Sequence, residues 1–148
     1  MREAEDLAVN EQWSERVGTF VSFTKTVSEA DIALFELISR DDDFVAEDPA
    51  PPVRQPHQIV PYPWLGSLLA TAASHLLPLP SQAGFTSHDI TFIEPAYTDD
   101  ILHMTVQILA YDEARQTIRV GVTCQNQEYR RLADGEFGLD AHTSSVRG

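Results

Sequence analysis

The chain has 148 residues, with 43% hydrophobic residues, 22% charged residues and a formal net charge of −13 at pH 7. These values predict a single globular domain that is large enough to bury a core. The negative charge disfavours nucleic acid and anionic membranes as partners. A single cysteine, Cys124, excludes an internal disulfide. No apolar run is long enough to span a membrane.

Residues 1–16 are polar and acidic, and we expect them to form a lead-in to one domain over 17–141. They lack the basic and apolar regions of a signal peptide, which predicts a cytoplasmic protein. Residues 19–27, "TFVSFTKTV", are β-branched and aromatic with near alternation and predict a strand. Residues 28–40 have apolar residues at helical spacing, and Ser28 with Asp31 is close to a capping box, so we expect a helix there.

A long irregular connection is expected over residues 41–63, which hold six of the nine prolines. It begins with the acidic stretch "ISRDDDFVAED" (38–48), and its apolar members favour a functional loop over disorder. The three aspartates do not have the spacing of a calcium loop. Glycine-rich phosphate motifs and metal-spaced histidines are also absent from the sequence. We therefore expect neither a metal nor a cofactor.

The second half of the chain predicts one helix followed by strands. "PWLGSLLATAASHLL" (63–77) has apolar residues on one helical face and small residues elsewhere, which indicates a buried helix covered on its sides. Strands are expected within 88–97, on both sides of the polar turn "DEARQ" in 101–127, and over 128–141 with a break at Gly135. Residues 142–148 read as a tail. The expected fold class is α+β, with a long helix packed on a curved antiparallel sheet.

Three segments resemble the MaoC-like dehydratases, the (R)-specific enoyl-CoA hydratases with a hot-dog fold. "GTFVSFTKTVSEADIALFELI" (18–38) is similar to the opening strand and helix of that family, and "ITFIEPAYTDDIL" (90–102) matches a later segment in which Asp99 replaces a glycine. "SRDDDFVAED" (39–48) stands where the family carries S-G-D-x-N-P-x-H-x-D. Asp41 matches the catalytic aspartate there, whereas Ala46 replaces the catalytic histidine.

The resemblance implies hydration of an enoyl thioester by an acid–base pair around one water, with backbone N–H groups at the start of the central helix holding the thioester oxygen. Tyr62 and Pro63 stand where the family has His-Gly, and Thr71 falls where several members place a serine. Pro63 has no N–H, so Trp64 is the alternative donor. The predicted catalytic residues are Asp41, His57 and Tyr62, and the predicted substrate-binding residues are Asp43, Arg54, Trp64 and Thr71.

Three functions remain open on these residues. The chain is a hydratase or dehydratase acting on an acyl thioester, a non-catalytic subunit paired with an active dehydratase, or a module that binds an acyl group or another small molecule. The retained Asp41 favours an enzyme, whereas Ala46 and Pro63 favour the other two functions. The expected ligand is an acyl-CoA or acyl-carrier-protein thioester, and the expected assembly is a homodimer or a heterodimer with an active subunit.

Overall fold

The computed structural model describes residues 13–39, 58–75 and 84–141. It contains five strands and two long helices, in the order β1 (Phe20–Thr26), α2 (Glu29–Ser39), α3 (Tyr62–His75), β2 (Phe85–Phe92), β3 (Ile101–Asp112), β4 (Thr117–Gln125) and β5 (Arg131–Asp140). The expected order of a strand, two helices and then antiparallel strands is confirmed, and so is the α+β class.

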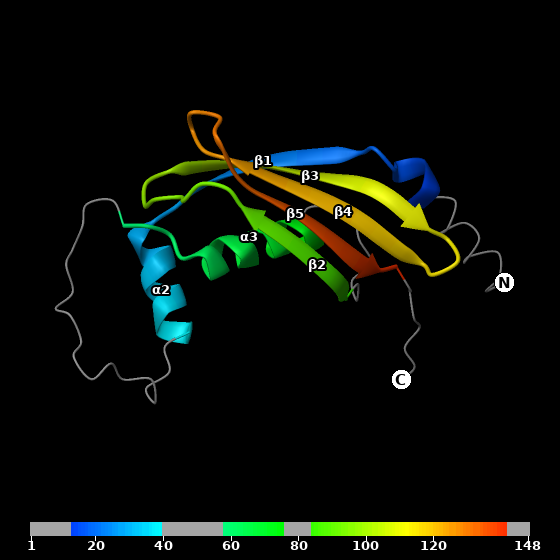
Figure 1. Cartoon of the computed structure of the whole chain (residues 1–148), viewed down its shortest axis with the longest axis horizontal. Coiled ribbons are helices and arrows are strands. Elements are labelled where there is room, and N and C mark those ends of the chain that lie inside the picture. The colour runs from blue at the N-terminus through cyan, green and yellow to red at the C-terminus, as the bar shows by residue number, and fades with distance from the viewer. Residues whose placement is uncertain (1–12, 40–57, 76–83, 142–148) are drawn as a thin grey trace.

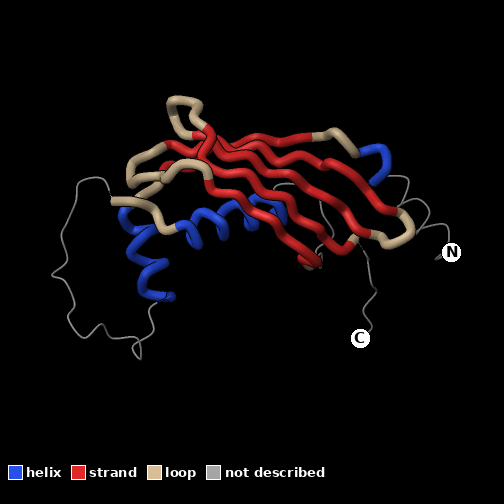
Figure 2. Tube along the Cα trace, viewed as in Figure 1, coloured by secondary structure: helices blue, strands red, loops and turns tan. Residues whose placement is uncertain are grey.

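All five strands form one antiparallel sheet in the order β1-β3-β4-β5-β2, so that β1 and β2 are its edges. The sheet lies over one side of α3, which packs against β3, β4 and β5 (Figure 1). Helix α2 lies at one end of the sheet and points away from it (Figures 1 and 2). Strand register shifts between Ile108 and Ala110 and between Cys124 and Gln125. Irregularities of this kind bend strands and increase their twist.

The core lies between the sheet and α3. Alternate residues of a strand point to opposite faces, so each long strand contributes a buried row to this side. These rows are Leu102, Met104, Val106 and Ile108 on β3, and Ile118, Val120, Val122 and Cys124 on β4. Helix α3 meets them with Leu65, Leu69, Ala72 and Ala73. Cys124 is a free and buried thiol within this core. Trp13, from the expected lead-in, also belongs to this core.

Two expectations about the elements are wrong. Strand β5 has no break at Gly135, because that residue is paired to Val122 on β4 and to Ile90 on β2 and is held from both sides. Helix α3 is not covered on all its sides, since Ser67 and Thr71 are exposed in the single chain. Leu76 and Leu77, at the expected end of this helix, lie outside the described residues.

The start of α2 follows the sequence expectation in detail. The Ser28 N–H donates to Asp31 Oδ2 at 3.1 Å, and the Asp31 N–H donates to Ser28 Oγ at 3.1 Å. This is a reciprocal capping box, which satisfies two backbone donors at the first turn. Ile32 is the residue of α2 that reaches the core, being 1% exposed. Within the described residues, no helix is long and apolar enough to cross a membrane.

Candidate active site

Among the described residues, two cavities lie along neighbouring faces of α3. One, of about 290 Å³, lies between α2, α3 and β1 and is called here the α2–α3 cavity; its lining residues are Lys25, Asp31, Leu34, Phe35, Ile38, Trp64, Ser67, Leu68 and Thr71. The other, of about 360 Å³, lies between α3 and the edge strand β2 and is called the α3–β2 cavity; its lining residues are Pro63, Gly66, Ser67, Ala70, Phe85, His88, Ile90, Phe92 and Phe137. Ser67 lines both, so at this point the wall between them is one side chain thick.

The α2–α3 cavity brings together two predicted substrate-binding residues, Trp64 and Thr71. Ile38, near the end of α2, lines the same cavity, and Asp41 follows Ile38 by three residues in the sequence. The Thr71 hydroxyl donates to the Ser67 carbonyl at 2.8 Å, so it faces a ligand as an acceptor unless this bond breaks. The Ser67 hydroxyl is engaged in the same way, donating to the Pro63 carbonyl at 2.8 Å.

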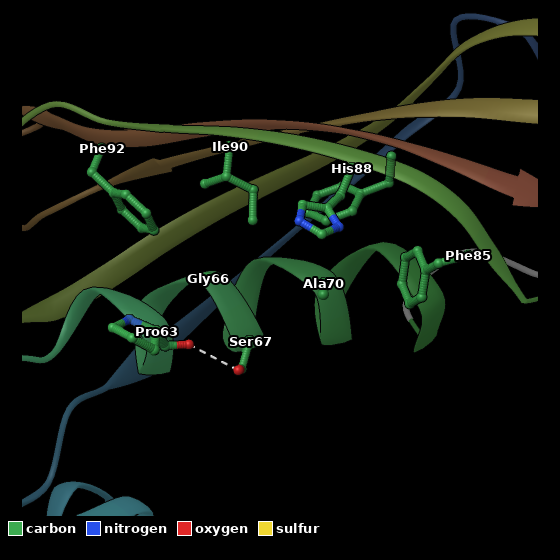
Figure 3. Close-up of a pocket in the computed structure, with 9 residues that line it drawn as sticks. Pro63, Gly66, Ser67, Ala70, Phe85, His88, Ile90 and Phe92 are labelled. Carbon is green, nitrogen blue, oxygen red and sulfur yellow. Dashed lines mark hydrogen bonds between the residues drawn. The ribbon is translucent and has the colours of Figure 1, made fainter. Parts of the chain in front are cut away.

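The α3–β2 cavity is mostly apolar. The side chains of His88, Ile90 and Phe92 point from β2 toward α3, and Phe85 closes the far end (Figure 3). Tyr62, a predicted catalytic residue, stacks on Phe92 with ring centroids 4.5 Å apart. The structure therefore places Tyr62 beside a wall of this cavity and does not bring it together with Trp64 and Thr71. His88 lines this cavity although it is exposed in the single chain.

The first turn of α3 has few free backbone donors. Pro63 has no N–H, and the N–H groups of Trp64 and Leu65 both donate to the Pro61 carbonyl, at 3.0 and 3.2 Å. The predicted role of Trp64 as a backbone donor to a thioester oxygen thus requires the loss of its bond to Pro61. Among the described residues, the Tyr62 N–H is the donor of this turn for which no backbone acceptor is found. A helix start normally offers several such donors to an anion.

Gln58, the first described residue after α2, lies beside that helix. Gln58 Nε2 donates to Glu36 Oε1 at 3.1 Å, which ties this residue to the helix that carries Ile38. The Gln58 N–H donates to the Thr98 hydroxyl at 3.0 Å, and the Val60 N–H donates to the Ala96 carbonyl at 2.8 Å. These bonds hold the segment that leads into α3. Residues 40–57, which carry Asp41, Asp43, Arg54 and His57, lie outside the described residues.

Lys25 and Asp31 form the charged part of the α2–α3 cavity, and sequence reasoning did not select them. Lys25 Nζ lies 3.0 Å from Asp31 Oδ2. Burial raises the pKa of the Asp31 carboxyl, but the hydrogen bonds from Lys25 and Ser28 outweigh this effect and hold the pKa below its ordinary value. Strand alternation in the sequence indicated that Lys25 faces inward, because it lies on the same face as Phe23 and Val21, two and four residues earlier. Val21 and Phe23 pack against the core.

An antiparallel sheet curved over one long helix, with cavities along that helix, defines the hot-dog class of α+β proteins. Solved structures with this fold include the R-hydratase PhaJ1 from Pseudomonas aeruginosa, with a TM-score of 0.68 and 20% identity over 89% of this chain and 90% of that chain. The (R)-hydratase from A. caviae involved in PHA biosynthesis has a TM-score of 0.68 and 22% identity over 85% of this chain and 96% of that chain.

The fold is also similar to a hypothetical thioesterase protein with coenzyme A from Streptococcus pneumoniae, with a TM-score of 0.61 and 14% identity over 94% of this chain and 95% of that chain. No family model matches the sequence, and no curated protein matches it either. The hot-dog fold expected from the resemblance to MaoC-like dehydratases is thus confirmed. At these identities the likeness establishes the fold, and the chemistry has to be argued from the cavities.

Proposed function

We propose that this chain acts on an acyl thioester by hydration of an enoyl group, or by the reverse dehydration, in the α2–α3 cavity. The observation that carries the proposal is that Trp64 and Thr71 line one cavity with Ile38, which precedes Asp41 by three residues. The cavity walls are mainly apolar, as a site for an acyl chain requires. Two of the similar solved structures are (R)-hydratases, which supports this reaction class.

Hydration needs two proton transfers. The water oxygen bonds to C3 of the enoyl group as a base takes its proton, the electrons of the C2–C3 double bond move toward the thioester carbonyl, and C2 then accepts a proton. We assign the base to Asp41, because a carboxylate accepts a proton from a water within hydrogen-bond reach. Ala46 offers no donor at the position where the family resemblance places a histidine. The second transfer therefore falls to another group, for which His57 is our candidate.

The proposed carrier of the acyl group is coenzyme A or an acyl carrier protein, and the proposed location is the cytoplasm. One similar structure was solved with coenzyme A. We further propose a homodimer, or a heterodimer with an active dehydratase subunit, formed through the edge strand β2. Exposed strand edges tend to pair with another chain, and Phe85 at this edge is 45% exposed. A mass of one chain in light scattering at micromolar concentration contradicts the homodimer.

A second candidate is a non-catalytic subunit, and the first turn of α3 favours it. In that turn Pro63 has no N–H, while those of Trp64 and Leu65 are engaged with Pro61. A developing oxyanion needs preorganised donors, and the loss of one such donor costs about 10²- to 10³-fold in turnover. A protein with this turn is therefore expected to be a slow enzyme by itself, or to support an active partner.

The test measures crotonyl-CoA hydration and free-thiol release side by side for the wild type and for Asp41→Asn, Ala46→His and His57→Ala. Slow hydration that Asp41→Asn abolishes without a change in melting temperature supports the proposal. Loss of activity in His57→Ala identifies His57 as the second group, whereas a gain in Ala46→His indicates that nothing has replaced the histidine. Thiol release without hydration identifies a thioesterase, and inactivity of the wild type and of Ala46→His favours the non-catalytic subunit.

A further inference from the structure

Lys25 is the one lysine of the chain, and it lies on the core-facing side of β1. Its neighbours at alternate positions, Val21 and Phe23, pack against the hydrophobic core. Lysine is rarely buried without a partner, because its ammonium group loses hydration there. The position of a half-buried lysine here therefore has to be explained by the groups around its ammonium. Its side chain is 35% exposed and lines the α2–α3 cavity.

Asp31 explains part of the position of Lys25, because it pairs with the ammonium group, but it does not engage all the donors of that group. Its carboxylate accepts from Lys25 Nζ at 3.0 Å and from the Ser28 N–H at 3.1 Å, so the capping box holds it in place at the start of α2. An ammonium group has three N–H donors. Among the described residues, no second carboxylate lies within ion-pair distance of Lys25. Within this part of the chain, the Lys25 ammonium thus has hydrogen-bonding capacity beyond its contact with Asp31.

The other lining residues of this cavity offer little competition as donors. Four of them have no side-chain donor, namely Leu34, Phe35, Ile38 and Leu68, and Trp64 has one neutral indole N–H. The hydroxyls of Ser67 and Thr71 already donate to carbonyls of their own helix. Within the described lining, Lys25 is therefore the one charged donor available to a ligand, and it lies on a mainly apolar wall.

We propose that Lys25 binds an oxyanion of the ligand and thereby sets the specificity of the α2–α3 cavity. The inference rests on the proposed function, because the ligand is taken to be an acyl thioester. The oxyanion is a carboxylate at the far end of the acyl group or a phosphate of the carrier, and either accepts a charge-assisted hydrogen bond from an ammonium group. Asp31 then acts as the fixed counter-ion that positions Lys25 from behind.

Binding assays with matched ligands separate the two sources of the oxyanion. N-acetylcysteamine thioesters carry no phosphate, so a crotonyl and a 3-carboxyacryloyl thioester of this carrier differ only at the terminal group, which is a methyl in the first and a carboxylate in the second. Crotonyl-CoA and the crotonyl thioester of N-acetylcysteamine instead differ in the carrier and its phosphates. Dissociation constants are measured by calorimetry for the wild type, Lys25→Met, Lys25→Arg and the control Arg115→Met. Arg115 is an exposed cation at the β3–β4 turn, so its loss changes the net charge by the same amount far from the cavity.

In the wild type, we expect the anionic member of one pair to bind at least about tenfold more tightly, which is the typical contribution of a hydrogen bond to a charged group. The preference should vanish in Lys25→Met and persist in Lys25→Arg and Arg115→Met. Circular dichroism and the melting temperature check that each variant is folded. If Lys25→Met does not fold, loss of the preference in Lys25→Gln replaces it as the test.

Equal binding within both pairs overturns the inference and leaves the proposed function standing. A preference that Lys25→Met retains, or that Arg115→Met also removes, overturns it as well, because the cation responsible is then not Lys25 or the effect is one of net charge. Failure of all three ligands to bind the wild type overturns both proposals together. Binding with the expected preference but without any hydration supports the Lys25 site and contradicts only the hydratase activity.

Discussion

Ser28 and Asp31 bind each other twice at the first turn of α2, with both N–H···O distances at 3.1 Å. The same carboxylate pairs with Lys25 at 3.0 Å, so one residue joins the cap of a helix to the wall of a cavity. We therefore expect substitutions of Asp31 to affect α2 directly and ligand binding indirectly, through α2.

Asp31→Ala is expected to lower the protection of the α2 amides against hydrogen exchange by about fivefold to tenfold at pH 7, since loss of an N-terminal cap costs about 1 kcal/mol. The folded-state pKa of Asp31 is below its ordinary value of 3.8, so its stabilisation is present above that pH and is lost as the pH falls through the folded-state pKa. The difference in α2 amide protection between the wild type and Asp31→Ala should therefore shrink below pH 4. Ser28→Ala keeps the Asp31 carboxylate, so its loss of amide protection should depend less on pH.

Thr71 and Ala70 are neighbours in sequence that line different cavities. Thr71→Leu extends into the α2–α3 cavity and is expected to weaken binding of an acyl thioester by about tenfold or more, because the added bulk occupies the space of the acyl chain. Ala70→Leu fills part of the α3–β2 cavity and should leave that binding unchanged. Calorimetric titration of crotonyl-CoA into both variants checks this. The opposite result would move the proposed acyl site to the α3–β2 cavity.

Cys124 is fully buried on β4, and this burial, with a smaller contribution from the negative charge of Asp134, raises the pKa of its thiol to about 12. Only the thiolate reacts quickly with thiol reagents, so we expect the native protein to be labelled no faster than it unfolds. Labelling with a chromogenic disulfide, followed against denaturant concentration, measures this. Fast labelling in the absence of denaturant would show that β4 is accessible.

The same thiol should affect stability at alkaline pH. The Cys124 thiol ionises at about pH 9 in the unfolded chain and at about pH 12 in the folded protein. Its contribution to the free energy of unfolding is therefore fully present below pH 9 and is lost as the pH rises toward 12. The free energy of unfolding falls by at most about 1.4 kcal/mol per pH unit through this group. Cys124→Ala should remove this component, which is read as the difference between the two proteins, because other groups titrate equally in both.

Asp99 has φ of 73° at the third position of the turn Tyr97–Asp100, which the Asp100 N–H closes by donating to the Tyr97 carbonyl at 3.1 Å. This backbone region favours glycine, which the family resemblance also predicts at this position. Asp99→Gly should therefore raise the free energy of unfolding by up to about 1 kcal/mol, or the melting temperature by about 2–4 °C. Thermal unfolding measures the shift.

Asp100→Ala is the contrasting variant in the same turn. Its carboxylate accepts from the Tyr97 N–H at 2.9 Å and from Gln127 Nε2 at 3.0 Å. We expect this change to lower stability by about 1–2 kcal/mol, because two donors lose their acceptor. A loss of stability in Asp99→Gly would instead indicate that the Asp99 carboxylate makes a stabilising contact.

Local patterns predicted most of the fold, because strand alternation and helix capping depend on near neighbours. The capping box at Ser28 and Asp31 and the buried row ending at Cys124 were both readable in this way. Gly135 was misjudged because a glycine in an isolated strand suggests a break, whereas here β4 and β2 hold it from both sides. Such pairing is a property of the whole sheet and has no signature in one segment.

The site was predicted less completely. The structure brings Trp64 and Thr71, both predicted to bind substrate, to one cavity, whereas the resemblance grouped Tyr62 with them. At about 100° per residue, Tyr62 lies roughly half a turn away from both, so helical periodicity alone indicated that it faces elsewhere. The stacking of Tyr62 on Phe92 confirms that direction. Asp41 and His57 lie outside the described residues, and their roles stay predictions.

Helix α2 supplies one wall of the α2–α3 cavity, yet Ile32 is the side chain that it buries fully, while Leu34, Leu37 and Ile38 are 58%, 68% and 75% exposed. An element with so little buried surface opens at a lower free energy than the sheet. The binding-competent population is then the fraction of molecules in which α2 is docked, and the apparent affinity is the intrinsic affinity multiplied by that fraction. Residues such as Ile32, which is buried and does not line the cavity, can therefore tune how tightly every ligand binds without changing which ligand is preferred.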